Sequence, residues 1–227
     1  MPKPRSERKI FVLSCALIAT GIILAIIGGT LAWHQRQENE AADKKAAVAQ
    51  YRANHGHATG SNPSTTKPKP GAFADWQVPA DEPRYIFIPE IGVKAVVKPT
   101  WQTKDGAIGT PTNIYDTSWY VHSAKPGQPG ATFIDGHVSS SASSGVFYKL
   151  KDLRSGDEIQ IEKGDGTRIT YRVVKKVFYA YDNVNMEQAL APVNPNKSGL
   201  TLMTCAGDVM PHTNSFSQRV AVFAEET

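Results

Sequence analysis

The sequence predicts a mainly-β domain that is tethered to a membrane. Three observations lead to this prediction: an uncharged segment near the N-terminus, a polar stretch rich in proline after it, and a series of short strand-like runs in the remainder. The chain has 227 residues, of which 41% are hydrophobic and 20% charged. Neither a disordered chain nor a polytopic membrane protein has this composition.

Residues 10–33 carry no charged side chain. As a helix they would extend roughly 36 Å, enough to cross a hydrocarbon core about 30 Å thick. Four basic residues and one acidic residue precede this segment within residues 1–9, which places the N-terminus in the cytoplasm and everything after Trp33 outside. A cleaved signal peptide ending at residues 30–32 is the alternative, but the apolar run exceeds the usual length of such signals. We therefore expect a single-pass anchor.

Residues 34–80 show no pattern of a packed core. The first part, 34–51, is polar and rich in alanine, and it reads as a solvated helical stalk. The second part, 52–80, is rich in glycine, serine, threonine and proline, which is typical of a linker with polyproline character. The folded domain is therefore expected at 81–227, long enough for one hydrophobic core.

The charge of the chain is unevenly distributed. The net charge is +4, yet residues 81–227 carry fifteen basic and sixteen acidic residues. A nucleic-acid-binding domain needs a basic face, so this near-neutral balance argues against that class. The chain has two cysteines, Cys15 and Cys205, too few for a disulfide scaffold.

The domain reads as mostly strand. Short helices are plausible at 145–153 and 185–190. Runs rich in β-branched and aromatic residues, separated by glycine and proline, lie at 84–88, 93–97, 131–134, 158–161, 168–174, 200–203 and 219–223. Seven or eight short strands with turn signals between them indicate a closed barrel or a sandwich.

Cys205 is the candidate nucleophile of the external domain. It follows the apolar run 200–203 and precedes Ala206, where we expect a loop to open. A thiol at a strand end is well placed for nucleophilic attack, although a small buried hydrophobic residue is the ordinary alternative. A reactive thiol also needs a proton acceptor or a positive neighbour.

Three histidines and one arginine could serve Cys205. His137 ranks first, because it follows a strand and the conformationally free Gly136, whereas His122 and His212 lie in turn or loop contexts. Arg219 begins the last strand. If that strand pairs antiparallel with 200–203, Arg219 and Cys205 lie at the same end of the sheet.

These residues resemble the motifs of the sortase family. Residues 200–205, Leu-Thr-Leu-Met-Thr-Cys, match the Thr-Leu-x-Thr-Cys signature of sortases. Residues 135–138 resemble the Gly-His motif of the family, and Arg219 falls where its arginine lies. Residues 86–93 look like the first strand pair.

The resemblance covers about 84–224, with all motifs in family order. Trp119-Tyr120 and the Pro-Gly turn at 126–127 are similar to class F, and less so to class E. The family implies an eight-stranded β-barrel with short helices, here preceded by one transmembrane helix and a linker.

The resemblance implies a cysteine transpeptidase with His137, Cys205 and Arg219 in the catalytic roles. Cys205 would form a thioester, His137 would be the acid/base, and Arg219 would hold the peptide or the oxyanion. Thr204 would line the substrate site. Asp135 is expected to play no part, because neighbouring strand residues face opposite ways.

The implied substrates are surface proteins with a C-terminal signal similar to Leu-Pro-x-Thr-Gly. The implied acceptor is a peptidoglycan precursor or a pilin amine of a Gram-positive cell wall. No cofactor, metal or nucleic acid is expected, and the only membrane contact expected is through residues 10–33.

Two other functions stay open from the sequence. The first is a thiol hydrolase with the same residues and water as the acceptor. The second is a non-catalytic surface-binding barrel, against which the presence of all three residues counts. An L,D-transpeptidase also uses an external cysteine, but its Ser-His-Gly-Cys context is absent, since Met203 and Thr204 precede the thiol.

Overall fold

The computed structural model describes residues 28–39, 63–69, 71, 76–104, 106–140, 143–211 and 215–227. The chain divides into two compact units, residues 1–56 and 57–227. In the first unit, residues 28–39 form an exposed helix. Among the helices of the described residues, none has the length and apolar character needed to cross a membrane. The predicted cytoplasmic segment 1–9 and most of the predicted anchor 10–33 lie outside the described residues.

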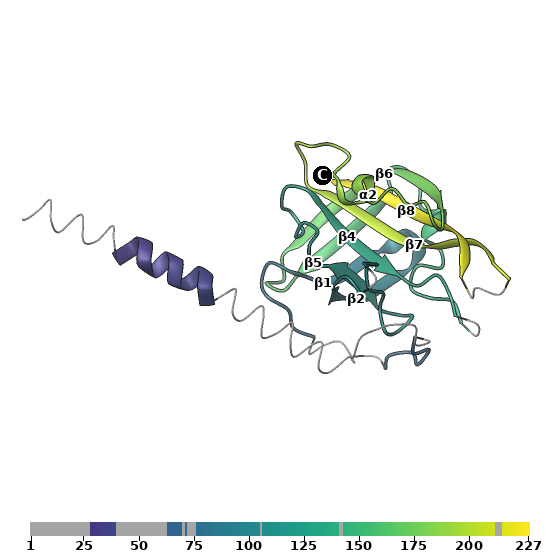
Figure 1. The fold of residues 1–227 in the computed structure, drawn as a ribbon, viewed down its shortest axis with the longest axis horizontal. Coiled ribbons are helices and arrows are strands. Elements are labelled where there is room, and N and C mark those ends of the chain that lie inside the picture. Colours follow the sequence, from purple (N-terminus) through teal and green to yellow (C-terminus); the bar gives the residue numbers. More distant parts are fainter. Residues whose placement is uncertain are drawn as a thin grey trace, which may run out of the picture. The chain divides into compact units, whose positions relative to one another are not determined.

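The second unit is a mainly-β closed barrel, as predicted (Figure 1). Its strands follow one another around the barrel in the order β1-β2-β3-β4-β7-β8-β6-β5. Pairing is parallel between β2 and β3 and between β4 and β7, and antiparallel elsewhere. The strands are β1 (Pro83–Ile88), β2 (Val93–Thr100), β3 (Thr117–Tyr120), β4 (Ala131–Gly136), β5 (Glu158–Lys163), β6 (Arg168–Ala180), β7 (Gly199–Val209) and β8 (Phe216–Glu226).

The shortest strand, β3, is the one that the sequence pattern missed. All four of its residues are buried, so they show no alternation of polar and apolar side chains. Thr117 is the register partner of Val97 on one side and of Gly136 on the other. This strand closes the gap between β2 and β4 and brings the number of strands in the barrel to eight.

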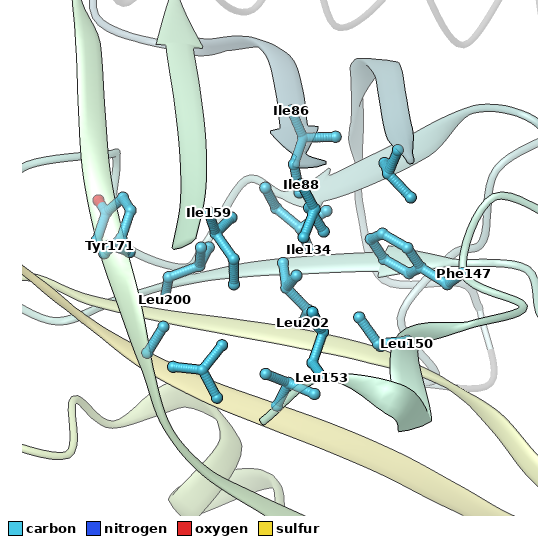
Figure 2. Close-up of a cluster of buried hydrophobic side chains, with 14 of the residues drawn as sticks. Ile86, Ile88, Ile134, Phe147, Leu150, Leu153, Ile159, Tyr171, Leu200 and Leu202 are labelled. Carbon is cyan, nitrogen blue, oxygen red and sulfur yellow. The ribbon is translucent and has the colours of Figure 1, made fainter. Parts of the chain in front are cut away.

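The barrel interior is filled by aliphatic side chains from nearly every strand. Figure 2 shows Ile86 and Ile88 of β1, Ile134 of β4 and Leu202 of β7 converging on this interior, and all four are fully buried. Phe147 also packs in it, from the segment that follows β4. Burying such apolar surface is the main favourable contribution to folding.

A second, smaller cluster lies on the opposite side of the sheet formed by β4, β7 and β8. Phe133, Met203, Ala221 and Phe223 belong to it, because they alternate along their strands with residues that face the interior. The short helix α2 (Met186–Leu190) contributes Ala189 and covers this cluster. The side chain of Asn185 caps the helix by accepting a hydrogen bond from the Gln188 N–H at 2.9 Å.

The two helices expected from the sequence are of different types. Helix α2 confirms the expected helix at 185–190. The short helix expected within 145–153 is the 3-10 helix η2 (Leu150–Asp152), and turns precede it. A second 3-10 helix, η1 (Pro89–Ile91), connects β1 to β2.

Three strands run further than their sequence patterns predicted. Strand β6 continues to Ala180 and β7 to Val209, while β8 begins at Phe216. The added segments pair with one another through the backbone, and this stabilises them without a polar–apolar alternation. Cys205 therefore lies inside β7, and the loop expected at Ala206 begins later.

Part of the segment expected to be a linker contacts the barrel. The Ser64 N–H donates to the Thr112 carbonyl at 2.8 Å, and the Ile114 N–H donates to the Ser64 carbonyl at 3.0 Å. The indole N–H of Trp76 donates to the Val97 carbonyl at 3.2 Å. Residues 63–69 thus lie along the loop that precedes β3.

We expect Leu202→Ala to lower the free energy of unfolding of the full chain by about 2–5 kcal/mol, because Leu202 is fully buried and its truncation leaves a cavity. Urea denaturation measures this change. The control is Val209→Ala in the same strand, where the side chain is 60% exposed and the expected change is below about 0.5 kcal/mol. Equal losses in both variants would contradict the core assignment.

Candidate active site

The hairpin of β7 and β8 brings Cys205 and Arg219 together. The two residues are direct register partners in the antiparallel ladder. Leu202 and Val220 face the barrel interior, so Cys205 and Arg219, which alternate with them, face outward. The sequence-based expectation that both lie at the same end of the sheet is confirmed.

His137 follows directly on β4, the strand that pairs with β7. Its Nε2 lies 2.7 Å from the carbonyl oxygen of Pro111. A carbonyl can only accept a hydrogen bond, so Nε2 carries the proton of the neutral ring and Nδ1 is left for proton exchange. The ring is therefore held in one orientation by the loop before β3.

The backbone around His137 is held by Gly145 and Phe147. The Phe147 N–H donates to the His137 carbonyl at 2.9 Å. A Cβ atom at Gly145 would approach the same carbonyl oxygen to 2.3 Å, so this close contact requires glycine. Because Phe147 packs in the core, the backbone at His137 is anchored to the barrel interior.

Thr204 is buried, and its hydroxyl forms an internal contact. It donates a 2.6 Å hydrogen bond to the carbonyl of Gly136, the residue before His137. This bond joins β7 to β4 between the thiol and the imidazole. Thr204 also lines a small cavity beside Cys205, described below.

Asp135 corrects one expectation from the sequence. It lies two residues before His137 and alternates with the inward-facing Ile134, so it points outward, toward the side of Cys205 and Arg219. The argument that neighbouring strand residues face opposite ways applies to adjacent positions, and Asp135 and His137 are two apart. Asp135 is half-buried, and among the described residues no cation lies within 4 Å of its carboxylate.

Burial sets the protonation states of this cluster. It raises the pKa of the Cys205 thiol, which the charge of Arg219 lowers and that of Asp135 raises further. Burial also lowers the pKa of His137, although the hydrogen bond to Pro111 acts to raise it. Burial raises the pKa of Asp135 to about 7, although the Gly136 N–H and Arg219 act in the opposite direction. At neutral pH the resting thiol and imidazole are therefore both uncharged.

Arg219 is held along the hairpin. Its Nη1 donates to the carbonyls of Gln218 at 2.9 Å and Phe216 at 3.1 Å, and its Nη2 donates to the Ser215 hydroxyl at 3.3 Å. Of the five N–H groups of a guanidinium, the Nε–H and one Nη2–H have no partner among the described residues.

A cavity of about 120 Å³ lies beside the thiol. It is lined by residues of the segment after β4 and of the β7–β8 hairpin, including Ser139, Tyr148, Lys151, Cys205 and Phe216. Because Cys205 lines this cavity and is half-buried, its thiol is accessible from the cavity.

The other sequence candidates lie elsewhere. His122 is exposed, and its ring contacts Tyr120 edge-on at 5.4 Å between centroids. His212 lies outside the described residues. Within the described part of the chain, no group of three or more histidine, cysteine or acidic side chains could hold a metal ion.

Residues 86–227, well over half of the chain, match the family model of the sortase domain. The chain belongs to the sortase family. Sortases are cysteine transpeptidases that act on sorting signals, and the family assignment therefore makes this protein an enzyme. A search of curated proteins gave no match.

Solved sortases share the fold of this chain. Sortase A from Corynebacterium diphtheriae is 23% identical, with coverage of 80% of this chain and 81% of that chain and a TM-score of 0.50. Sortase C-1 from Actinomyces oris is 19% identical, with coverage of 83% and 98% and a TM-score of 0.50. A pilus-related sortase C of Group B Streptococcus is 18% identical, with coverage of 84% and 90% and the same TM-score. At these identities the likeness establishes the fold alone.

We expect Asp135→Asn to make the thiol of this sortase more reactive above pH 7. An ionised carboxylate opposes the thiolate, and the amide removes that charge with little change of shape. Alkylation of Cys205 by iodoacetamide, followed by peptide mass spectrometry, should therefore be about threefold faster or more at pH 8. At pH 5.5 the wild-type carboxyl is mostly protonated, and the two rates should converge.

Asp208→Asn is the matched control, since Asp208 is an exposed acid of β7, the strand that carries Cys205. It should leave the alkylation rate unchanged at both pH values. If Asp135→Asn had no effect at pH 8, or slowed the reaction, the electrostatic contact with Cys205 would be refuted.

Proposed function

We propose that this sortase cleaves a sorting signal similar to Leu-Pro-x-Thr-Gly and joins the released protein to an amine of the cell wall or of a pilin. The observation that carries the proposal is the direct pairing of Cys205 with Arg219 on the outward face of the barrel, beside His137. This arrangement combines a nucleophile, a proton carrier and a cationic donor, which are the groups that acyl transfer through a thioester requires.

In the first half of the reaction, the Cys205 thiol gives its proton to His137, and the sulfur attacks the threonine carbonyl carbon. The carbonyl oxygen becomes an oxyanion, and the two unpartnered N–H groups of Arg219 are suited to bind it. The C–N bond to glycine then breaks, the protonated His137 gives its proton to the leaving amine, and a thioester remains on Cys205.

In the second half, the acceptor amine attacks the thioester carbon. His137 removes the proton of the amine, the new C–N bond forms, and the C–S bond breaks to release the thiolate. Water as the acceptor gives hydrolysis by the same steps.

The protonation states favour activation after the peptide is bound. In the resting site the thiol and imidazole are both neutral, because burial disfavours their charged forms. Transfer of the thiol proton to His137 creates a thiolate and an imidazolium together, and each stabilises the other. We therefore propose that Nδ1 of His137, the nitrogen not bonded to Pro111, carries the proton.

We propose that Thr204 supports the site from the wall of the cavity beside Cys205. Its hydrogen bond to Gly136 fixes the spacing of β4 and β7, on which the separation of His137 and Cys205 depends. Its place in the wall of the 120 Å³ cavity is also consistent with contact to a bound signal peptide.

We further propose that residues 10–33 anchor the enzyme in the membrane, with the catalytic domain outside. The uncharged segment and the basic residues before it support this topology. We also propose that this sortase resembles class F. This proposal rests on Trp119-Tyr120 and the Pro-Gly turn at 126–127.

The decisive experiment incubates the full chain, in neutral detergent, with a library of Leu-Pro-x-Thr-Gly-like peptides and triglycine. Mass spectrometry should find a product in which triglycine replaces the leaving group, and an enzyme-bound thioester on Cys205. Cys205→Ala should lower kcat/KM by at least about 10⁴-fold, because it removes the nucleophile. Turnover by this variant near the wild-type rate would refute the mechanism.

Histidine variants provide the matched comparison in that assay. His137→Ala should lower kcat/KM by about 10²–10⁴-fold, the usual contribution of a general acid–base. His122→Ala, at an exposed histidine, should retain full activity. Hydrolysis without any triglycine product would identify a thiol hydrolase instead of a transpeptidase.

We expect Arg219→Lys to lower kcat/KM by about 10²–10³-fold. Lysine keeps the charge but loses the planar donor set, and one lost transition-state donor typically costs this much. Arg172→Lys, at an exposed arginine of β6, is the control and should retain activity. Melting curves that match for both variants, together with a fully active Arg219→Lys enzyme, would assign Arg219 no part in the chemistry.

A further inference from the structure

A large groove lies beside the active site and has no part in the chemistry described above. Its volume is about 760 Å³. One wall is formed by residues 67–69 and 71 of the segment before the barrel, and the other by residues 91–94, Tyr115 and residues 144–146, 148 and 149. We call it the lysine groove, after Lys67, Lys69, Lys94 and Lys149, which line it.

In the described part of the chain, each charged residue that lines the lysine groove is a lysine. Its four lysines are exposed, and none of them has a carboxylate within 4 Å among the described residues. None of the described residues that line the groove is acidic. The whole segment 81–227 carries one more acidic than basic residue, so this local excess of positive charge is not an average property of the domain.

Two carboxylates close to the groove in sequence contact other residues. Glu90, next to Ile91, lies near the Glu158 N–H at 3.5 Å, and Asp116, next to Tyr115, pairs with Lys98 at 2.6 Å. Neither lines the groove. Among the described residues these lysines therefore have no ion-pair partner, and a bound anion would neutralise part of their charge.

The groove adjoins the cavity of Cys205. Tyr148 lines both, and it lies between Phe147, which bonds the His137 carbonyl, and Lys149 of the groove. Lys151, two residues after Lys149, lines the cavity beside Cys205. A ligand in the lysine groove would thus lie next to the cavity that contains the Cys205 thiol.

Lysine ammonium groups bind phosphate as point charges. Tyr115 and Tyr148 also line the groove, and a tyrosine hydroxyl is a neutral hydrogen-bond donor. We propose that the lysine groove binds an anionic group, a phosphate monoester or diester, which is carried by the amine acceptor. This inference rests on the proposed transfer to an amine. It adds that the acceptor is recognised by its negative charge as well as by its amine.

The test compares two acceptors for the full chain in neutral detergent: Gly-Gly-Gly-Ser and the same peptide with phosphoserine. Transfer to each is measured with the best signal peptide. We expect a KM about fivefold or more lower for the phosphorylated acceptor, with similar kcat, since the groove contributes binding away from the reacting atoms. This preference should shrink at high salt, which screens exposed charges.

The matched variants exchange three lysines for glutamine. In Lys67→Gln/Lys69→Gln/Lys149→Gln, the KM of the phosphorylated acceptor should rise to that of the plain acceptor. Peptide hydrolysis without acceptor should be unchanged, which also shows that the variant is folded. The control Lys104→Gln/Lys163→Gln/Lys197→Gln removes the same charge outside the groove and should keep the preference.

Each outcome decides one of the two proposals. Equal KM values for both acceptors in the wild type, or equal losses in the groove and control variants, would overturn the inference and leave transpeptidation intact. Absence of transfer to either amine would overturn the proposed function and this inference together. If the two acceptors had equal KM values while vesicles of anionic lipid bound the wild type more tightly than the groove variant, a membrane headgroup would occupy the groove, and its assignment to the acceptor would be wrong.

Discussion

The parallel pairing of β4 with β7 is the constraint on which the site depends. It sets Asp135 beside Met203, and it puts the end of β4 next to the part of β7 that carries the thiol. The hydrogen bond from Thr204 to Gly136 fixes this spacing at the point where His137 leaves the strand. Because the inner faces of both strands are packed into the barrel, the outward side chains have little freedom to shift.

Burial and charge act against each other in the outward cluster. Partial burial favours uncharged Cys205, His137 and Asp135, while Arg219 is the permanent charge among them. In a site of this kind the resting thiol is unreactive, and a bound ligand is needed to favour proton transfer from the thiol to the imidazole. The adjoining lysine groove has the opposite character, because its lysines are exposed and have no ion-pair partner among the described residues, and this suits it to binding rather than to chemistry.

The residues that define the candidate site were predictable because their signals are local. The run 200–205 combines an apolar strand with a thiol, and Gly136 before His137 marks a turn of the backbone. Strand β3 and the extensions of β6, β7 and β8 were missed, since their backbones are held by pairing across the barrel rather than by an alternating pattern. The outward position of Asp135 follows from its place next to the inward-facing Ile134 in β4.

The sequence by itself determined the mainly-β class, the family motifs and the identity of Cys205, His137 and Arg219 as candidates, because residue type and spacing carry this information. Only the tertiary structure decided the order in which the strands close the barrel, paired Cys205 directly with Arg219, and bonded His137 to Pro111. It also gathered four lysines from three separate segments into one groove. These contacts join residues far apart in the chain, and no local pattern encodes which distant segments a closed sheet will bring together.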